Sequence, residues 1–157
     1  MTSDPTFSEN GAHDIAAVME VMDAAFDPIF GEAWSRSQCL GIFDLPGVWL
    51  STAFVDAVPA GFALTRAVMD EAELLLLGVA PAFRRRGIGR ALLDRAMDHA
   101  RANGVIRFHL EVRQGNDAIA LYSRAGFQQA GTRRDYYRGR DGALHDAISL
   151  VRTLRDD

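Results

Sequence analysis

Two glycines and four arginines stand close together in Pro81-Ala82-Phe83-Arg84-Arg85-Arg86-Gly87-Ile88-Gly89-Arg90-Ala91, between an apolar run and a helical pattern. Glycine lets an anion approach the backbone closely, and the first turn of a helix offers unpaired N–H groups and positive dipole charge. This setting predicts a phosphate-binding loop. A Walker A loop is excluded because Gly-Lys-Ser/Thr is absent, and a dinucleotide fingerprint is excluded because Leu92 replaces the third glycine. A flexible turn with solvated arginines explains the same spacing.

Strand-like and helical patterns flank this loop. Before it, β-branched and aromatic residues over 48–55, 60–69 and 73–79 predict three consecutive antiparallel strands. After it, apolar residues recur at helical spacing over 88–100, and a strand is expected over 106–112. A strand, a helix and a second strand in this order form a right-handed crossover between parallel strands.

The rest of the chain adds helices and a hairpin. Ile15, Val18, Met19, Met22 and Phe26 share one helix face, and core packing is the expected role of that face. Further elements are expected as a helix over 36–44 capped by Ser35, a helix over 117–125 capped by Asn116, and a hairpin of Phe127–Tyr137 with Ala143–Leu154. The sequence therefore predicts one α+β domain over residues 1–157. Its mixed, twisted central sheet has antiparallel N-terminal strands, one parallel crossover and a C-terminal hairpin, flanked by about four helices.

Composition narrows the class of protein. Seventeen Lys and Arg against 21 Asp and Glu give a formal net charge of −4, which argues against a general nucleic-acid binder. No apolar run approaches the roughly 18 residues of a membrane helix, and the N-terminus lacks the pattern of a secretory signal, so we expect a cytoplasmic protein that does not bind membranes. Cys39 is the only cysteine, which excludes a disulfide framework, and we expect a buried, inert thiol.

Motifs on either side of the loop resemble those of the GNAT family of N-acetyltransferases over most of the chain. Arg84-Arg85-Arg86-Gly87-Ile88-Gly89 matches the family's pyrophosphate signature, Arg/Gln-x-x-Gly-x-Gly/Ala. Within the family the chain looks most like the RimI-type ribosomal-protein alanine N-acetyltransferases. That likeness is carried by Trp34-Ser35, Leu110-Glu111-Val112-Arg113, Arg133-Arg134-Asp135-Tyr136-Tyr137 and Asp146-Ala147-Ile148.

The resemblance implies acetyl-coenzyme A as the cosubstrate. Backbone N–H groups of the loop would hold its pyrophosphate, and the Val79 N–H would polarise the thioester carbonyl. A bulge at Gly78 would separate this strand from the one ending near Val112, although packing of a small residue also explains that glycine. The implied coenzyme-binding residues are Leu77, Gly78, Val79, Arg84, Arg85, Arg86, Gly87, Ile88, Gly89, Arg90, Asn116 and Tyr122.

By the same resemblance, the acceptor amine attacks the thioester directly in a ternary complex. Glu111 is then the expected general base and Tyr122 the expected general acid for the departing thiolate. The alternatives are purely structural: Glu111 would form a surface ion pair with Arg113, and Tyr122 would only pack in the core. His109 shares the strand face of Glu111 and is either an auxiliary proton carrier or a partly exposed residue.

Tyr136 and Tyr137 match the tyrosine pair that lines the acceptor pocket of N-terminal acetyltransferases, and Trp34 is expected to face them. A strand-end aromatic patch and a buried tryptophan are the alternatives. Asp135 and Glu32 could attract a basic ribosomal protein. The implied function is acetylation of the N-terminal α-amino group of a protein or peptide. Alternatives are a family member that acetylates a small-molecule amine or amino acid, or a noncatalytic acyl-coenzyme A sensor. The remaining histidines have no ligand spacing, so no metal is expected: His13, His99 and His145.

Overall fold

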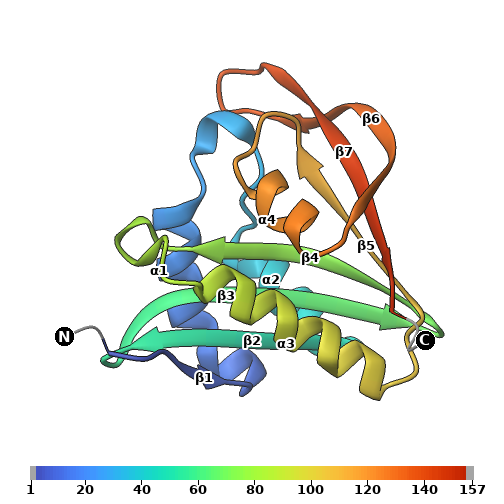
Figure 1. The fold of residues 1–157 in the computed structure, drawn as a ribbon. Coiled ribbons are helices and arrows are strands. Elements are labelled where there is room, and N and C mark those ends of the chain that lie inside the picture. Colours follow the sequence, from blue (N-terminus) through green and yellow to red (C-terminus); the bar gives the residue numbers. More distant parts are fainter. Residues whose placement is uncertain (1–2, 155–157) are drawn as a thin grey trace.

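The computed structural model describes residues 3–154, which form a seven-stranded sheet in the order β1-β2-β3-β4-β5-β7-β6 (Figure 1). The strands are β1 (Thr6–Ser8), β2 (Val48–Val55), β3 (Val58–Val68), β4 (Glu71–Val79), β5 (Arg107–Arg113), β6 (Gln128–Arg138) and β7 (Leu144–Thr153). The helices are α1 (Ile15–Ala25), α2 (Arg36–Phe43), α3 (Ile88–Ala102) and α4 (Ala118–Arg124), with short 3₁₀ turns at Gly11–Asp14, Pro28–Phe30 and Pro81–Phe83.

The strand pairing confirms the predicted mixed α+β sheet. Strands β2, β3 and β4 are antiparallel, β4 and β5 are parallel and joined through α3, and β6 and β7 form the C-terminal hairpin. β1 was not anticipated, because a strand of only three residues carries no readable alternation. Between residues 3 and 154, none of the helices combines the length and hydrophobicity needed to cross a bilayer.

Apolar side chains fill both faces of the sheet. On one face, α3 contributes Leu92, Leu93 and Ala96, each with no exposed surface, and α4 packs beside it. On the other face, α1 contributes Val18 and Met22. Burying a leucine of this kind contributes about 1.5–3 kcal/mol. The two helical periodicities read from the sequence are therefore core faces.

Three residues in and next to α1 and α2 can be compared with their predicted roles. Phe26 lies just beyond α1, as its extended C-terminal cap residue, and still packs against the same core. Ser35 caps α2 as predicted, because its hydroxyl accepts from the Gln38 N–H while the Gln38 side chain accepts from the Ser35 N–H. Cys39 is fully buried in α2, and burial raises the pKa of its thiol, so it stays protonated and inert as expected.

The parallel pairing of β4 with β5 stops partway along both strands. It covers Glu71–Leu74 with Arg107–Leu110 and goes no further, and Figure 1 shows β5 turning away from β4 beyond that point. On the other edge of β4, Leu64 pairs with Leu76 and the next residue, Thr65, with Leu74, so the bulge lies at Leu75. A bulge increases local twist and re-aims a strand, which accounts for the separation.

The prediction of a bulge at Gly78 was therefore wrong in position. Gly78 pairs in regular register with Phe62. A Cβ built on Gly78 would lie 3.1 Å from the Phe26 ring and 3.2 Å from the Phe62 ring. Both rings belong to the core, so close packing requires a small residue here.

The segment between α1 and α2 is fastened to the turn between β6 and β7. The Arg140 N–H donates to the Pro28 carbonyl at 3.0 Å. Gly31 has a φ of +69°, and a Cβ on it would lie 1.8 Å from the Arg138 carbonyl oxygen. A Cβ on Gly139 would lie equally close to the Ile29 carbonyl oxygen. Only glycine permits this backbone approach.

Gly31→Ala is expected to lower the free energy of unfolding by roughly 3 kcal/mol, because a left-handed backbone strain and a clash with backbone act together. Gly104→Ala is the matched control, since Gly104 has a φ of +83° and nothing within 4 Å of a built Cβ. It should lose only about 1 kcal/mol. Urea unfolding of both variants measures the difference, and equal losses would contradict the backbone contact.

Candidate active site

A cavity of about 770 Å³ opens where β4 and β5 separate. Its walls come from β4, the start of α3, β5, α4, the α1–α2 segment and the end of β6. A volume of this size is typical of a site for a cofactor or drug-sized ligand. The predicted site residues that line it are Trp34, Leu77, Gly78, Val79, Arg84, Arg85, Gly87, Ile88, Gly89, Arg90, Glu111, Asn116, Tyr122, Tyr136 and Tyr137. Arg86 is not among them; it is exposed, and its guanidinium carbon lies 5.4 Å from the centroid of the Phe83 ring.

The loop before α3 lines this cavity. Arg85 and Gly87 both have positive φ values, +64° and +76°. Left-handed residues of this kind turn successive N–H groups toward one point, which makes a concave anion site. No side chain caps the N-terminus of α3, so the N–H groups of Ile88, Gly89 and Arg90 have no partner within the helix. These features agree with the predicted phosphate loop, and its ligand stays a prediction.

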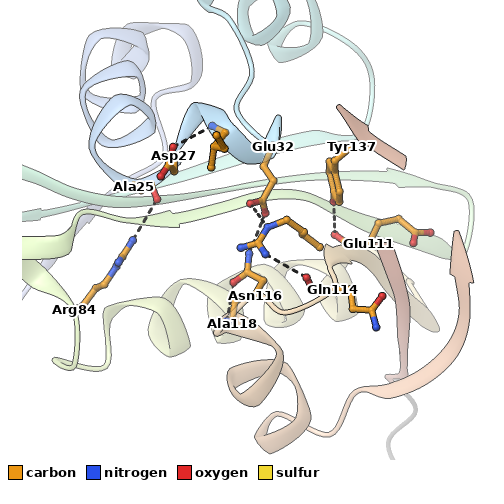
Figure 2. A network of polar contacts seen from close by, with 11 residues as sticks. Ala25, Asp27, Glu32, Arg84, Glu111, Gln114, Asn116, Ala118 and Tyr137 are labelled. Atoms are coloured by element: carbon orange, nitrogen blue, oxygen red, sulfur yellow. Dashed lines mark hydrogen bonds and ion pairs between the residues drawn. The ribbon is translucent and has the colours of Figure 1, made fainter. Parts of the chain in front are cut away.

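Val79 presents its own backbone to the gap between β4 and β5. The N–H of Ala80 donates to the Ala60 carbonyl at 2.8 Å, on the β3 side. Because the hydrogen-bonding groups of successive strand residues point to opposite edges, those of Val79 point away from β3. Arg84 Nε donates to the Val79 carbonyl at 3.3 Å. Figure 2 shows the second contact of this side chain, in which Arg84 Nη2 donates to the Ala25 carbonyl at 3.3 Å. Arg84 therefore braces the mouth of the gap.

Glu111 projects from β5 with only 10% of its side chain exposed. Its Oε2 accepts a hydrogen bond from Ser149 Oγ at 2.6 Å, and its Oε1 lies 3.1 Å from Arg133 Nε. The alternative pairing with Arg113 was wrong, because Arg113 reaches across to Glu32 instead, at 2.9 Å. Ser149 was missed by sequence reasoning, since it meets Glu111 through the β5–β7 register.

Tyr122 lies at the inner end of the cavity with 5% of its surface exposed. Its ring packs edge-on against Phe127, with centroids 5.9 Å apart. Burial, together with the negative charge of Glu32, raises the pKa of the phenol well above its usual value. The hydroxyl is therefore fully protonated near neutrality, so it is a hydrogen donor rather than a base.

Glu32 and Asn116 join the α1–α2 segment to the start of α4. Asn116 Nδ2 donates to Glu32 Oε2 at 3.0 Å, and Asn116 Oδ1 accepts from the Ala118 N–H at 2.8 Å (Figure 2). The Arg113 guanidinium, which pairs with the other Glu32 oxygen, lies 3.6 Å from the centroid of the Phe30 ring. Asn116 was predicted as the cap of this helix, but the N-cap residue of α4 is Asp117, and Asn116 lies one position earlier and accepts from the first helical N–H. Its coenzyme contact stays a prediction.

The tyrosine pair closes the opposite side of the cavity. Tyr136 and Tyr137 meet edge-on with centroids 4.9 Å apart, and the Tyr137 hydroxyl donates to the Glu111 carbonyl at 3.3 Å. Arg133 pairs with Ala147 and Tyr137 with His145, so β6 uses four steps where β7 uses two. This irregularity places both rings at the cavity, and the sequence carried no sign of it.

The polar residues expected near the acceptor differ in their partners and in their exposure. Glu32 already has Arg113 as a counter-ion, whereas Asp135 is exposed at a φ of +54° and its N–H donates to Asp146 Oδ1. His109 is half-buried beside Glu73 in the parallel register. Among residues 3–154, no three His, Cys, Asp or Glu side chains are grouped as a metal site would require.

Three comparisons place this site in a known family. The model of the acetyltransferase (GNAT) family matches residues 15–127. The [ribosomal protein bS18]-alanine N-acetyltransferase of Escherichia coli strain K12 is 48% identical over 93 residues, which cover 59% of this chain and 62% of that protein's length. The N-alpha-acetyltransferase RimI of Mycobacterium tuberculosis is 54% identical over 69 residues, covering 43% of this chain and 42% of that protein.

The fold agrees with the sequence matches. The crystal structure of the ribosomal-protein-S18-alanine N-acetyltransferase from Escherichia coli superposes with a TM-score of 0.85 at 32% identity, covering 98% of this chain and 96% of that one. The family model ends before β6, so it includes the loop, β4, β5, α3 and α4 but not the tyrosine pair, whereas the structural likeness covers nearly the whole chain. The chain therefore belongs to the acetyltransferase (GNAT) family.

Proposed function

We propose that this protein is an acetyl-coenzyme A-dependent N-acetyltransferase whose acceptor is the N-terminal α-amino group of a protein, with a ribosomal protein beginning in alanine as the first candidate. One observation carries the proposal: a single cavity holds the anion loop, the open edge of Val79, the carboxylate of Glu111 and the hydroxyl of Tyr122. The names of the bacterial relatives support the acceptor class. A ribosomal-protein acceptor implies a cytoplasmic location.

The coenzyme half of the reaction uses mainly backbone. The N–H groups of 85–90 hold the pyrophosphate, which carries negative charge and suits both the concave loop and the helix dipole. The pantetheine arm lies along Leu77–Val79 in the gap that β5 leaves open. The Val79 N–H then donates to the thioester carbonyl, where a positioned donor stabilises the developing oxyanion and contributes about 10²–10³ in rate.

Proton transfers accompany the acetyl transfer. An α-ammonium group has a pKa of about 7.7–8.0, so a base must take its proton before it can attack. Glu111 accepts that proton, directly or through a water molecule. The neutral amine forms a C–N bond to the thioester carbon, the C–S bond then breaks, the thiolate leaves, and the nitrogen releases its second proton. Tyr122 donates a proton to the sulfur and recovers the one that the nitrogen releases; burial, which raises the pKa of its phenol, keeps the hydroxyl protonated until the thiolate forms.

The acceptor enters between Trp34 and the tyrosine pair, on the face of β5 that carries Glu111. Peptides and small amines compete for this assignment, because both present an amine of the required chemistry. A panel of peptides with different first residues, assayed beside free amino acids and simple amines, tests it by coenzyme A release. Preference for a small amine would replace the acceptor in the proposal, and release with none of them would favour the noncatalytic sensor.

Tyr122→Phe removes the hydroxyl and little else. Because the ring keeps its packing against Phe127, stability and coenzyme binding are expected to stay close to those of the wild type. Turnover should fall on the order of 10²-fold if the hydroxyl donates the proton. Steady-state kinetics with thermal unfolding in parallel measures both effects. Unchanged turnover would assign Tyr122 to packing alone.

A further inference from the structure

Both oxygens of the Glu111 carboxylate have a partner in the free protein. Ser149 donates to Oε2, and Arg133 pairs with Oε1. The two partners differ in how firmly they are held. Ser149 is half-buried in β7 and lies directly opposite Glu111 in the strand register. The Arg133 side chain comes from β6 and is 62% exposed.

Arg133, the exposed partner, places a positive charge on the Glu111 carboxylate. In the proposed function, the positively charged ammonium group of the acceptor must bind to the same carboxylate. An acceptor ammonium and the Arg133 guanidinium would repel each other at the same Oε1 atom. The ion pair is open to water on the Arg133 side only, and we take the scale of a water-screened pair, a factor of about 1.4–5 in an equilibrium constant. An arriving ammonium group can therefore displace the guanidinium at small cost, whereas Ser149 remains to orient the other oxygen.

Arg133 also has a second contact on the same strand. Its guanidinium carbon lies 5.7 Å from the centroid of the Tyr136 ring. A cation over an aromatic face is attracted by the ring quadrupole. The irregularity of β6 between Arg133 and Tyr137 brings ring and guanidinium to one side. Arg133 can thus leave the carboxylate by side-chain rotation and keep a favourable contact.

We propose that Arg133 occupies the position of the acceptor ammonium on Glu111 in the free enzyme and gives it up when the acceptor binds, while its contact with the Tyr136 ring is kept. This inference rests on the acceptor site proposed above. Arg133 then acts as an internal competitor that selects for acceptors with a charged amine. It weakens acceptor binding and takes no part in the acetyl transfer itself.

Arg133→Met separates these effects. With a short peptide that begins with alanine, KM should fall about 1.4- to 5-fold, because the competitor is gone, and kcat should stay unchanged. Arg133→Lys keeps a cation and should retain a KM near that of the wild type. Arg134→Met is the matched control: Arg134 is exposed and forms no ion pair within residues 3–154, so the same loss of charge should leave KM unchanged. A higher KM in Arg133→Met, or a lower kcat at constant KM, would overturn the proposal.

The same Arg133 substitution made in a Glu111→Gln variant distinguishes the competition at Glu111 from the proposed function on which it rests. In Glu111→Gln, which has no charge for Arg133 to pair with, adding Arg133→Met should leave KM unchanged. A KM change that persists there would overturn the competition at Glu111. Full activity of Glu111→Gln alone would overturn only its role as base. The same series with alaninamide covers small acceptors, and both proposals fail if wild type acetylates neither compound.

Discussion

Glu111→Gln lowers turnover on the order of 10²-fold or more at pH 7, with coenzyme affinity and stability near those of the wild type. The amide keeps an oxygen that can accept from Ser149, so the local packing survives. It cannot take a proton. As the pH rises through the amine's own pKa of about 8, more acceptor is already neutral, and turnover should recover in part. A pH profile of kcat for wild type and variant measures this recovery.

Glu71→Gln is the control for the loss of one carboxylate. Glu71 is exposed at the start of β4, outside the cavity. It should show the wild-type pH profile. An equally slow Glu111→Gln at every pH, together with weak peptide binding, would make Glu111 an acceptor-binding group. Full activity at pH 7 would require a base elsewhere in the cavity.

Gly89→Glu is expected to abolish acetyl-coenzyme A binding and leave a folded protein. Gly89 is in the first turn of α3 and lines the cavity, so a carboxylate there would enter the pyrophosphate position and repel it. A ligand at 100 times its dissociation constant adds about 2.7 kcal/mol to the stability of the native state. That stabilisation, seen as a thermal shift with acetyl-coenzyme A, should disappear.

Two control variants separate the effect of the new negative charge at position 89 from the effect of losing the glycine. Gly41→Glu makes the same change in α2, where a built Cβ meets nothing within 4 Å, and it should keep the thermal shift. In Gly89→Ala the new methyl would lie 3.5 Å from the side chains of Leu121 and Val79, an ordinary contact. That variant should fold normally and bind the coenzyme better than Gly89→Glu does. A full thermal shift in Gly89→Glu would make the loop a turn without a ligand role.

The fold could be read from the sequence wherever periodicity was strong. The apolar spacing in α1 and α3 and the β-branched runs of β2 to β4 set these elements within about two residues, because local pattern and burial agree there. The bulge at Leu75 could not be read. It depends on how β4 is held between β3 and β5, and the conspicuous glycine nearby serves ring packing instead.

In the candidate site, too, local features could be predicted from the sequence and long-range contacts could not. The loop before α3 and the turn at Asn116 are local, so sequence spacing located the loop and set the start of α4 to within one residue. The partners of Glu111 and Arg113 come from other strands and from the α1–α2 segment. Sequence spacing made Arg113 a plausible partner of Glu111, but Arg113 pairs with Glu32, and Arg133 pairs with Glu111. Only the three-dimensional arrangement of the strands decides these pairings. Long-range ion pairs of this kind have no periodic signature.

The separation of β4 from β5 has a further consequence for the sheet as a whole. Its outer edges are β1 and β6, but beyond Leu74 and Leu110 the sheet acquires two inner edges that have no strand partner. Free strand edges invite pairing with other chains. In the binding mode proposed above, the pantetheine arm fills this gap and pairs with those strand edges, so we expect the bound cosubstrate to lower the tendency to self-associate. The proposed cosubstrate would then complete a part of the β-sheet that the chain itself leaves open.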